Sequence, residues 1–396
     1  MLFKASSSRS HAARLYQQKR QQQQRLLIVG VIAFFLACLS CLAVWGVCQA
    51  ATKFFQPLPV HTGQFEAYME QEFGFSKNPP SLLYAGNNLD YNLLAHPAAS
   101  LFKNKLLPIL PVSEDRELKA RIEQLFAEYP ASKYTPHFYF YNPQTNTYVE
   151  INGYGPAPAA SVIKLPILLD YLMSLDENLI TVDTPLLYAE FHRAGGAGEL
   201  QYRPTGQDFK ANDVASQMIR ISDNTCTNMM ISYLGGTDAV NQRLSDLGLV
   251  NTRIRNWLPD LTGTNTISPY EMVTILNNID HGPLISEVSR YNGISILEST
   301  HNRRLLVAPL PNQAIVAHKT GDIGTAIGDS GIVYMPDGRK YYISMQVERP
   351  YNDYTVRDMV QRTSRLLYDY VASQPPTGND QPIAAQPAVT PLKTPI

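Results

Sequence analysis

A chain of 396 residues that is 44% hydrophobic can bury a full core, and its length suggests one large domain or two ordinary ones. Its net charge is −1, but residues 1–25 carry six basic and no acidic side chains, which leaves 27 basic and 34 acidic residues on the remainder. Because this body is mildly acidic and lacks a basic stripe, we expect no nucleic-acid partner.

The basic arm of residues 1–25 precedes 23 uncharged residues, 26–48. As a helix at about 1.5 Å per residue they span a hydrocarbon core of roughly 30 Å, so we predict a single transmembrane anchor. The positive-inside tendency then puts the arm in the cytoplasm and the remainder on the extracytoplasmic, periplasmic side of the cell membrane. A signal peptide cleaved after Ala50 is the alternative, but the apolar run exceeds the roughly 7 to 15 residues of a signal-peptide core.

Residues 51–112 contain seven prolines that interrupt any long periodicity, and we predict a stalk or linker there. The tail, residues 374–396, is rich in Pro, Ala, Gln and Thr without apolar periodicity, so we predict that it is disordered. The main folded domain is therefore expected between residues 113 and 373.

Within that domain, apolar spacing predicts a helix over residues 114–128. Strands are predicted at 137–141 and 147–151, helices through most of 161–290, strands at 314–317, 331–334 and 341–347, and a last helix at 355–371. This order predicts an antiparallel sheet built from both ends of the domain, with a helical insertion between them.

The first chemical motif is Ser161-Val162-Ile163-Lys164, which precedes an apolar helix. Positions three apart share one helix face, so the Lys164 ammonium can come within reach of the Ser161 hydroxyl. The helix dipole also favours a developing alkoxide at the N-terminus. A nucleophile beside a base is the minimum for covalent acyl transfer, although Ser100 and Lys103 show that this spacing also arises by accident.

The second motif, Ser222-Asp223-Asn224, follows a predicted helix. A second hydroxyl can pass a proton to a leaving group, and an amide side chain can bind both a lysine and a substrate amide. The same cluster could also serve only to cap a helix.

The third motif is Lys319-Thr320-Gly321, at the end of a predicted strand. Lysine and threonine can bind a carboxylate there, and glycine permits close approach. Read alone, the motif is also compatible with an ordinary strand end followed by a turn.

Together, S-x-x-K, S-D-N and K-T-G in this order are the signature of class A β-lactamases and penicillin-binding proteins. The gaps are 61 residues from Ser161 to Ser222 and 97 from Ser222 to Lys319, and only Ser161, not Ser100, has this spacing. The chain thus resembles that serine hydrolase superfamily over residues 113–373. The resemblance implies an α/β (α+β) fold of three layers, with an antiparallel sheet of about five strands flanked by helices and an all-helical subdomain.

The resemblance also implies a role for each motif residue. Ser161 would be the acylated nucleophile and Lys164 its base or proton relay. Ser222 would protonate the leaving nitrogen, while Asn224 orients Lys164 and the substrate amide. The substrate-binding residues would be Lys319, Thr320, Gly321 and Asp322, with the backbone amides of Ser161 and Asp322 forming the oxyanion hole.

One catalytic residue of the class A enzymes is missing from this pattern. Their deacylating glutamate would fall at Leu258, in the stretch Asn256-Trp257-Leu258-Pro259-Asp260. Without that base the acyl-enzyme should be long-lived. Asp260 is the alternative base, although a carboxylate two residues away normally points elsewhere. The arginine that many β-lactamases place just after K-T-G-D is absent too.

Three functions are compatible with these residues. The first is a serine hydrolase acting on β-lactams or related acyl-amides through an acyl-enzyme on Ser161. The second is an enzyme acting on peptidoglycan D-Ala-D-Ala peptides or on esters, and the third is a wall-binding or sensing module without turnover. We expect a small-molecule β-lactam or a peptidoglycan peptide as the substrate, and a monomeric catalytic domain. No cofactor is expected, and the eight histidines show no metal-ligand spacing.

Overall fold

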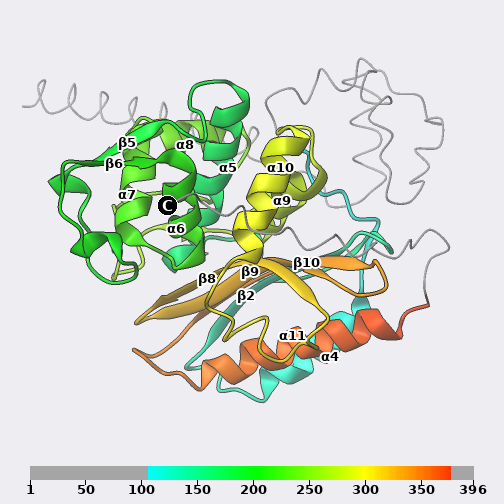
Figure 1. Cartoon of the computed structure of the whole chain (residues 1–396). Helices are drawn as coiled ribbons and strands as arrows, with labels where there is room; N and C mark the ends of the chain where they lie inside the picture. Colours follow the sequence, from blue (N-terminus) through cyan, green and yellow to red (C-terminus); the bar gives the residue numbers. More distant parts are fainter. Residues whose placement is uncertain (1–105, 376–396) are drawn as a thin grey trace, which may run out of the picture. The chain divides into compact units, whose positions relative to one another are not determined.

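The computed structural model describes residues 106–375, all within one compact unit (Figure 1). The predicted arm (1–25) and anchor (26–48) lie outside the described residues, as do nearly all of the stalk and of the tail. Within residues 106–375, no helix is long and apolar enough to cross a membrane.

A six-stranded sheet of order β1-β3-β2-β10-β9-β8 forms the middle layer. Its five long strands pair antiparallel, as predicted, and the two-residue β1 adds a parallel edge beside β3. The strands are β1 (Ser113–Glu114), β2 (Thr135–Asn142), β3 (Thr147–Ile151), β8 (Ile315–Ile323), β9 (Ala326–Tyr334) and β10 (Lys340–Glu348).

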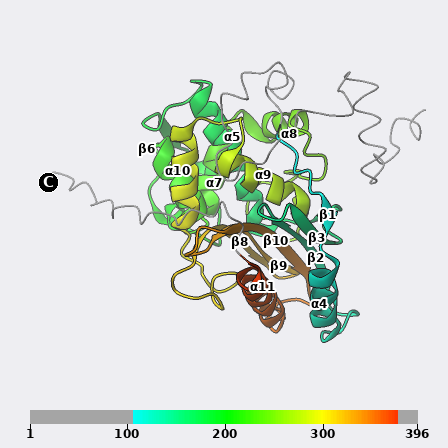
Figure 2. The same ribbon diagram turned by 90° about the vertical axis from the view of Figure 1, so that its right-hand side faces the viewer.

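One face of the sheet is covered by α4 (Arg116–Ala127) and α11 (Val356–Ser373), which pack side by side in Figure 2. Both helices are amphipathic: Leu118 and Ile122 of α4 and Val360 of α11 are fully buried, whereas charged residues cover the outer surface. They share a core with alternate sheet residues, including Phe138 and Ile343.

The other face carries the helical layer, with α5 (Lys164–Asp176) at its centre. Every residue of α5 from Lys164 to Ser174 is buried, as expected for a helix that is apolar on all sides. Around it lie α6 (Ala211–Arg220), α7 (Asn224–Tyr233), α8 (Gly236–Asp246), α9 (Pro269–His281) and α10 (Glu287–Glu298). Two short antiparallel strand pairs, β5 (Pro185–Tyr188) with β6 (Gln207–Lys210) and β4 (Ala157–Pro158) with β7 (Thr266–Ile267), complete the layer.

Two strands are longer than the sequence predicted. Strand β8 continues from the predicted end at 317 to Ile323, and β9 begins at Ala326 rather than at 331. Most of the added residues are polar or glycine and interrupt the apolar signal, yet they pair in register, with Lys319 opposite Ser330 and Gly321 opposite Gly328. The K-T-G motif therefore lies within a strand at the edge of the sheet, not beyond its end.

Candidate active site

Ser161 lies on a short 3-10 helix, η2 (Ala160–Ile163), that leads directly into α5. The preceding Ala160 has a φ of +46°, a strained value for a residue with a side chain. Ser161 is partly exposed, and its hydroxyl makes no hydrogen bond to any described residue. The nucleophile predicted from the sequence is therefore accessible to a ligand.

Lys164, the first residue of α5, is completely buried and connects the nucleophile's helix to the S-D-N motif. Its Nζ lies 2.6 Å from the carbonyl oxygen of Ser222, 3.0 Å from Ser222 Oγ and 2.9 Å from Asn224 Oδ1. The hydrogen bonds of Lys164 thus run to Ser222 and Asn224 rather than to Ser161, from which it is one helical turn away.

The S-D-N motif forms the turn between α6 and α7. Ser222 has a φ of +59°, and Asp223 is the N-cap of α7, accepting from the amide of Cys226 at 2.9 Å. The Asp223 carboxylate also accepts from the amides of Glu199 and Leu200 at 2.7 and 2.9 Å. Asp223 is therefore occupied in holding the turn and an adjacent loop, which leaves Ser222 and Asn224 to face Lys164.

Asn224 uses both ends of its amide. While Oδ1 accepts from Lys164, Nδ2 donates to the carbonyl of Gly195 at 2.9 Å. Gly198 in the same loop has a φ of +105°, and a Cβ there would fall 2.3 Å from a carboxylate oxygen of Asp223. Glycine is required at this position because the loop passes so close to the motif.

Lys319 of β8 is completely buried and reaches the same serine from the other side. Its Nζ lies 3.1 Å from Ser222 Oγ and 2.7 Å from the carbonyl oxygen of Thr320. Thr320 is nearly buried, and its hydroxyl makes no hydrogen bond within residues 106–375, so it is available to a ligand. Ser222 therefore lies between two buried lysines.

Gly321 allows β8 to pass against the nucleophile's turn. A Cβ on Gly321 would fall 3.0 Å from the backbone nitrogen of Ser161 and 2.9 Å from Ala160 Cβ. The absence of a side chain thus brings the edge of β8 next to the Ser161 amide.

The backbone N–H of Asp322 points away from β9, towards the open edge of the sheet. The carbonyl of His318 accepts from Thr300, and that of Thr320 from Lys319, so both point away from β9. Within a strand the N–H and C=O of a residue share one side, and alternate residues repeat it. The N–H of Asp322 therefore has the same outward direction, which suits its predicted place in the oxyanion hole.

Burial changes the acid–base behaviour of both lysines. Burial, together with the charge of Lys319, holds the pKa of Lys164 well below its usual value. Burial also lowers the pKa of Lys319 to about 7, against a partly compensating attraction from Asp329. Lys164 therefore gives up its proton more readily than an exposed lysine, and its neutral amine can accept a proton.

The contacts of a neutral Lys164 define a direction for proton transfer. Its two N–H groups match two oxygens that can only accept, the Ser222 carbonyl and Asn224 Oδ1. When Lys164 carries a third proton, it donates that N–H to Ser222 Oγ at 3.0 Å, and Lys319 donates to the same oxygen at 3.1 Å. A proton on Lys164 can thus pass to Ser222.

The loop that carries Leu258 is held to α7 by one side chain. Asn228 accepts from the backbone N–H of Leu258 at 2.9 Å and donates to its carbonyl at 2.8 Å. Leu258 itself is buried, at 7% exposure. An apolar side chain therefore occupies the place that the family resemblance assigns to the deacylating glutamate.

The Asp260 carboxylate is hydrogen-bonded to residues of its own loop. Its carboxylate accepts from the Asn265 amide at 2.6 Å and the Thr264 hydroxyl at 2.9 Å. Burial would raise the pKa of Asp260, but these hydrogen bonds outweigh it and keep the pKa below its usual value. A weakly basic, fully bonded carboxylate is a poor candidate to activate water.

The side chains that pair with Asp322 and His318 gave no signal in the sequence. Asp322 directs its carboxylate to Arg349, on the segment after β10, and Arg357 lies 3.8 Å away. His318, beside Lys319, points to the opposite face of the sheet and contacts Asp329 at 2.9 Å. Charge alone does not reveal such partners, because the chain segments that carry them meet only in the folded sheet.

Comparison with known proteins decides the family. The model of the beta-lactamase enzyme family, Beta-lactamase2, matches residues 117–371. The chain belongs to this family. A beta-lactamase of Bacteroides uniformis is 27% identical over 231 residues, covering 54% of this chain and 78% of that protein. Beta-lactamase VEB-1 of Pseudomonas aeruginosa is 25% identical and covers 52% of this chain and 75% of that protein.

Solved structures agree with this family assignment. PBP-A is 39% identical, with a TM-score of 0.64, and the match covers 68% of this chain and all of PBP-A. A leucine-to-glutamate variant of PBP-A, solved as an acyl-enzyme complex with penicillin G, matches equally well. A beta-lactamase of Chitinophaga pinensis, at 24% identity and a TM-score of 0.60, shares the fold. The chain is therefore a serine hydrolase of the class A β-lactamase type.

Proposed function

We propose that this hydrolase reacts with β-lactams and related acyl-amides through an acyl-enzyme on Ser161, and that it releases the acyl group slowly. The observation that carries the proposal is the hydrogen-bonded chain from Lys164 through Ser222 to Lys319, next to a buried Leu258. The hydrogen-bonded residues supply a base and a proton donor for acylation. Leu258 supplies no base for deacylation.

Acylation follows from the geometry. Lys164 takes the Ser161 hydroxyl proton as the serine oxygen attacks the substrate carbonyl carbon. The backbone amides of Ser161 and Asp322 stabilise the oxyanion. When the C–N bond breaks, the proton moves from Lys164 to Ser222 as Ser222 gives its own proton to the leaving nitrogen. Lys319 and Thr320 bind the substrate's carboxylate.

Deacylation lacks a positioned base. Hydrolysis of the ester needs a water activated by proton transfer, which typically contributes 10² to 10⁴-fold to the rate. Leu258 cannot accept a proton, and the Asp260 carboxylate is bonded within its loop. The acyl-enzyme structure of the PBP-A variant supports the choice of a penicillin as the probe.

The test mixes the full-length protein with a fluorescent penicillin and follows both covalent labelling and loss of the β-lactam. We expect stable one-to-one labelling that is lost in Ser161→Ala and retained in a control, Ser216→Ala, which removes a partly buried serine on α6. Rapid turnover dependent on Ser161 would instead show an efficient β-lactamase with a different base. No labelling at all would overturn the acyl-enzyme assignment for β-lactams.

A peptidoglycan D-Ala-D-Ala peptidase or transpeptidase is the second candidate. The same observation favours it, because an enzyme without a deacylating carboxylate can pass its acyl group to an amine instead of water. Release of D-Ala from a D-Ala-D-Ala peptide, dependent on Ser161, would support this activity. Penicillin labelling without any peptide cleavage would leave the non-turnover sensing module.

We also propose that residues 26–48 anchor the protein in the cell membrane, with a monomeric catalytic domain on the extracytoplasmic side. The 23 uncharged residues after a basic arm support this placement. Fractionation of cells and the mass of the mature protein test it. A soluble product beginning at Ala51 would show cleavage after Ala50 and would overturn the anchor.

A further inference from the structure

The turn between β8 and β9 is held by the segment that follows β10. The Arg349 amide donates to the Thr325 carbonyl at 2.9 Å, and the Asn352 amide to the Gly324 carbonyl at 2.8 Å. The Tyr351 ring lies so close to Gly324 that a Cβ there would fall 2.2 Å from it. The end of the active-site strand therefore cannot shift without this segment.

The Arg349 side chain completes the attachment. It is entirely buried, and its Nη2 donates both to the Asp322 carboxylate and to the Ile323 carbonyl, the latter at 2.9 Å. Its guanidinium carbon also lies 4.7 Å from the centre of the Tyr354 ring. One guanidinium thus holds the side chain of Asp322 and the carbonyl of the next residue.

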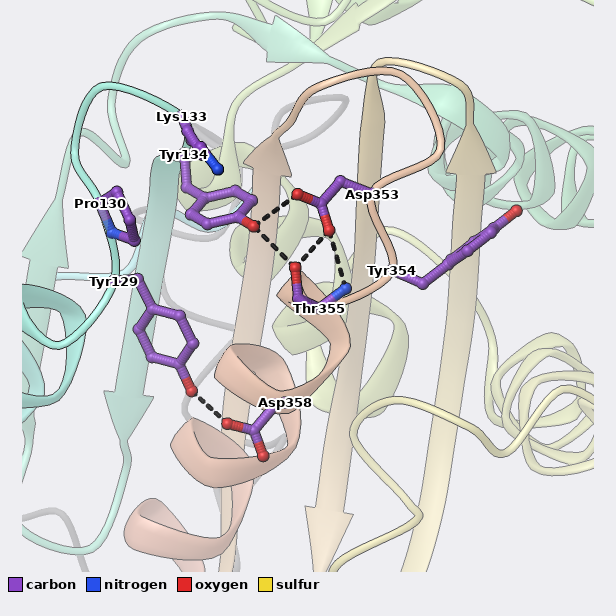
Figure 3. A pocket seen from close by; sticks show the side chains of 8 residues that line it. All are labelled: Tyr129, Pro130, Lys133, Tyr134, Asp353, Tyr354, Thr355 and Asp358. Carbon is purple, nitrogen blue, oxygen red and sulfur yellow. Dashed lines mark hydrogen bonds between the residues drawn. The ribbon is translucent and has the colours of Figure 1, made fainter.

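The segment is itself fixed to the start of β2. The Tyr134 hydroxyl donates to the Asp353 carboxylate at 2.7 Å and lies 2.7 Å from the Thr355 hydroxyl (Figure 3). Tyr134 is 7% exposed, and Arg349 Nη1 donates to the Asp353 carbonyl at 3.4 Å. Arg349 is therefore held by a rigid support and is not a mobile surface charge.

We propose that Arg349 is a positioning residue of the oxyanion hole, which rests on the acylation proposed above. Strand β8 is an edge strand, so only β9 pairs with the peptide that carries the Asp322 N–H. Arg349 fixes Asp322 through its side chain and through the carbonyl of the residue that follows it. Donors to an oxyanion act only when held within about 0.5 Å of the productive position.

Arginine suits this role better than lysine. The planar guanidinium directs several N–H groups in fixed directions, so it can hold a carboxylate and a carbonyl together. A lysine retains the charge and part of the packing but is a point donor without this fork. Arg349→Lys should therefore loosen the Asp322 peptide while keeping a counter-charge for its carboxylate.

Arg339 provides a matched control at the opposite end of the sheet. Its side chain is 8% exposed, pairs with Asp337 at 2.5 Å in the β9–β10 turn, and donates to the Gln374 carbonyl at 2.9 Å. Arg339→Lys thus disturbs a comparable arginine–carboxylate attachment of a hairpin turn, remote from Ser161.

The experiment measures penicillin acylation of the full-length protein by stopped flow, separating the limiting acylation rate from the initial binding constant. For Arg349→Lys we expect a limiting rate at least about tenfold lower, part of the 10² to 10³-fold effect of losing one oxyanion donor. Initial binding should change little. Affinity for a boronic acid, whose adduct with Ser161 resembles the tetrahedral intermediate, should fall by the same factor. Arg339→Lys should acylate at the wild-type rate.

Equal limiting rates in Arg349→Lys and Arg339→Lys, despite similar losses of melting temperature, would overturn the positioning role alone. A wild-type protein that penicillin does not label would overturn the proposed function, and the positioning role with it. If Arg349→Lys does not fold, Asp322→Asn removes the same ion pair and keeps the backbone N–H. It should show the same loss of rate, and a wild-type rate there would also contradict the inference.

Discussion

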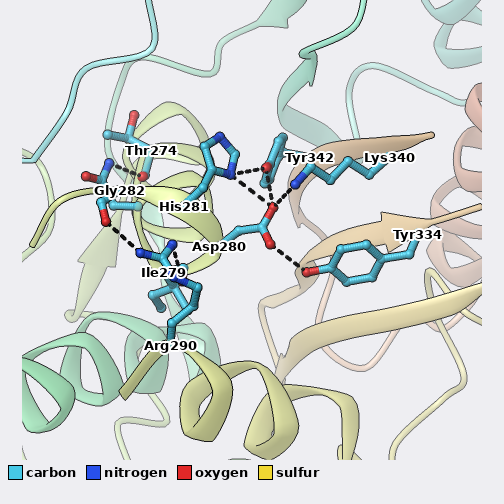
Figure 4. Close-up of polar contacts among 10 residues, drawn as sticks. Thr274, Ile279, Asp280, His281, Gly282, Arg290, Tyr334, Lys340 and Tyr342 are labelled. Atoms are coloured by element: carbon cyan, nitrogen blue, oxygen red, sulfur yellow. Dashed lines mark hydrogen bonds and ion pairs between the residues drawn. The ribbon is translucent and has the colours of Figure 1, made fainter. Parts of the chain in front are cut away.

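Two regions of this molecule place lysines at the contact between the sheet and the helical layer, but only one of them gives its lysine a contacting carboxylate. At the active site, Lys164 and Lys319 are fully buried and contact hydroxyl, carbonyl and amide oxygens. At the far end of the same sheet, Lys340 is 22% exposed and forms an ion pair with Asp280 of α9 at 2.5 Å (Figure 4).

The Asp280 carboxylate is supported on several sides. Tyr342 donates to it at 2.6 Å and Tyr334 at 3.0 Å, and His281 lies 3.2 Å away. Burial alone would raise the pKa of Asp280, but Lys340 and His281 hold it far below its usual value. This carboxylate stays ionised and joins α9 to β9 and β10.

The difference lies in the counter-charge. A buried lysine without a contacting carboxylate loses its proton readily and becomes a base, whereas a lysine beside a carboxylate stays charged and stabilises the fold. The acidic residue of the S-D-N motif confirms the pattern, because three backbone amides occupy the Asp223 carboxylate. Among the described residues, no carboxylate contacts Lys164 or Lys319, whereas Asp280 contacts Lys340.

The largest expected effect comes from removing the base. Lys164→Met should lower the acylation rate by roughly 10² to 10⁴-fold, the usual contribution of a general base, and leave the domain folded. Stopped-flow labelling with penicillin measures the rate, and Lys133→Met, which changes an exposed lysine, serves as the control. Acylation at the wild-type rate in Lys164→Met would show that another group takes the Ser161 proton.

The free energy of unfolding should respond differently to loss of a lysine at the two ends of the sheet. Lys340→Met leaves the Asp280 carboxylate without its main counter-charge and should lower the free energy of unfolding by about 3 kcal/mol. Lys319→Met removes a buried lysine that lacks a contacting carboxylate and should leave that free energy unchanged or raise it. Denaturant unfolding at pH 7 measures both, and equal destabilisation would contradict the distinction between the regions.

A carboxylate added to the catalytic region should change the rate of deacylation. Leu258→Glu should speed release of the penicilloyl group by about tenfold or more, since it supplies a base to the deacylating water. The decay of fluorescent labelling measures this release. Leu258→Gln has the same shape without the charge and should release the label no faster than wild type. Equal release by both variants would rule out a charge effect at this position.

Much of the fold and of the active site could be predicted from the sequence, because these features leave local patterns or motifs in it. The three motifs predicted the residues that the structure brings together around Ser222, and apolar periodicity predicted five antiparallel strands. The extension of β8 was missed because Lys319, Thr320 and Asp322 are polar, although backbone pairing with β9 continues through them.

Residues that support the site through the fold were also missed. Asn228 bonds the backbone of Leu258, 30 positions away, and Arg349 bonds Asp322, 27 positions away. A polar residue in a helix, or an arginine after a strand, gives no local indication of which distant group it will bind. The sequence therefore predicts the reacting groups more readily than their supports.

The pH dependence of the second-order rate constant for acylation by penicillin tests whether Lys164 acts as the base. Because the pKa of Lys164 is lowered, the rate should rise to its maximum well below pH 10. It should then fall as pH rises through about 7 and Lys319 loses the charge that binds the substrate's carboxylate. The fall should be absent in Lys319→Met and for an ester substrate without a carboxylate. A rate that rises steadily towards pH 10 would show that Lys164 keeps its proton and would contradict the account.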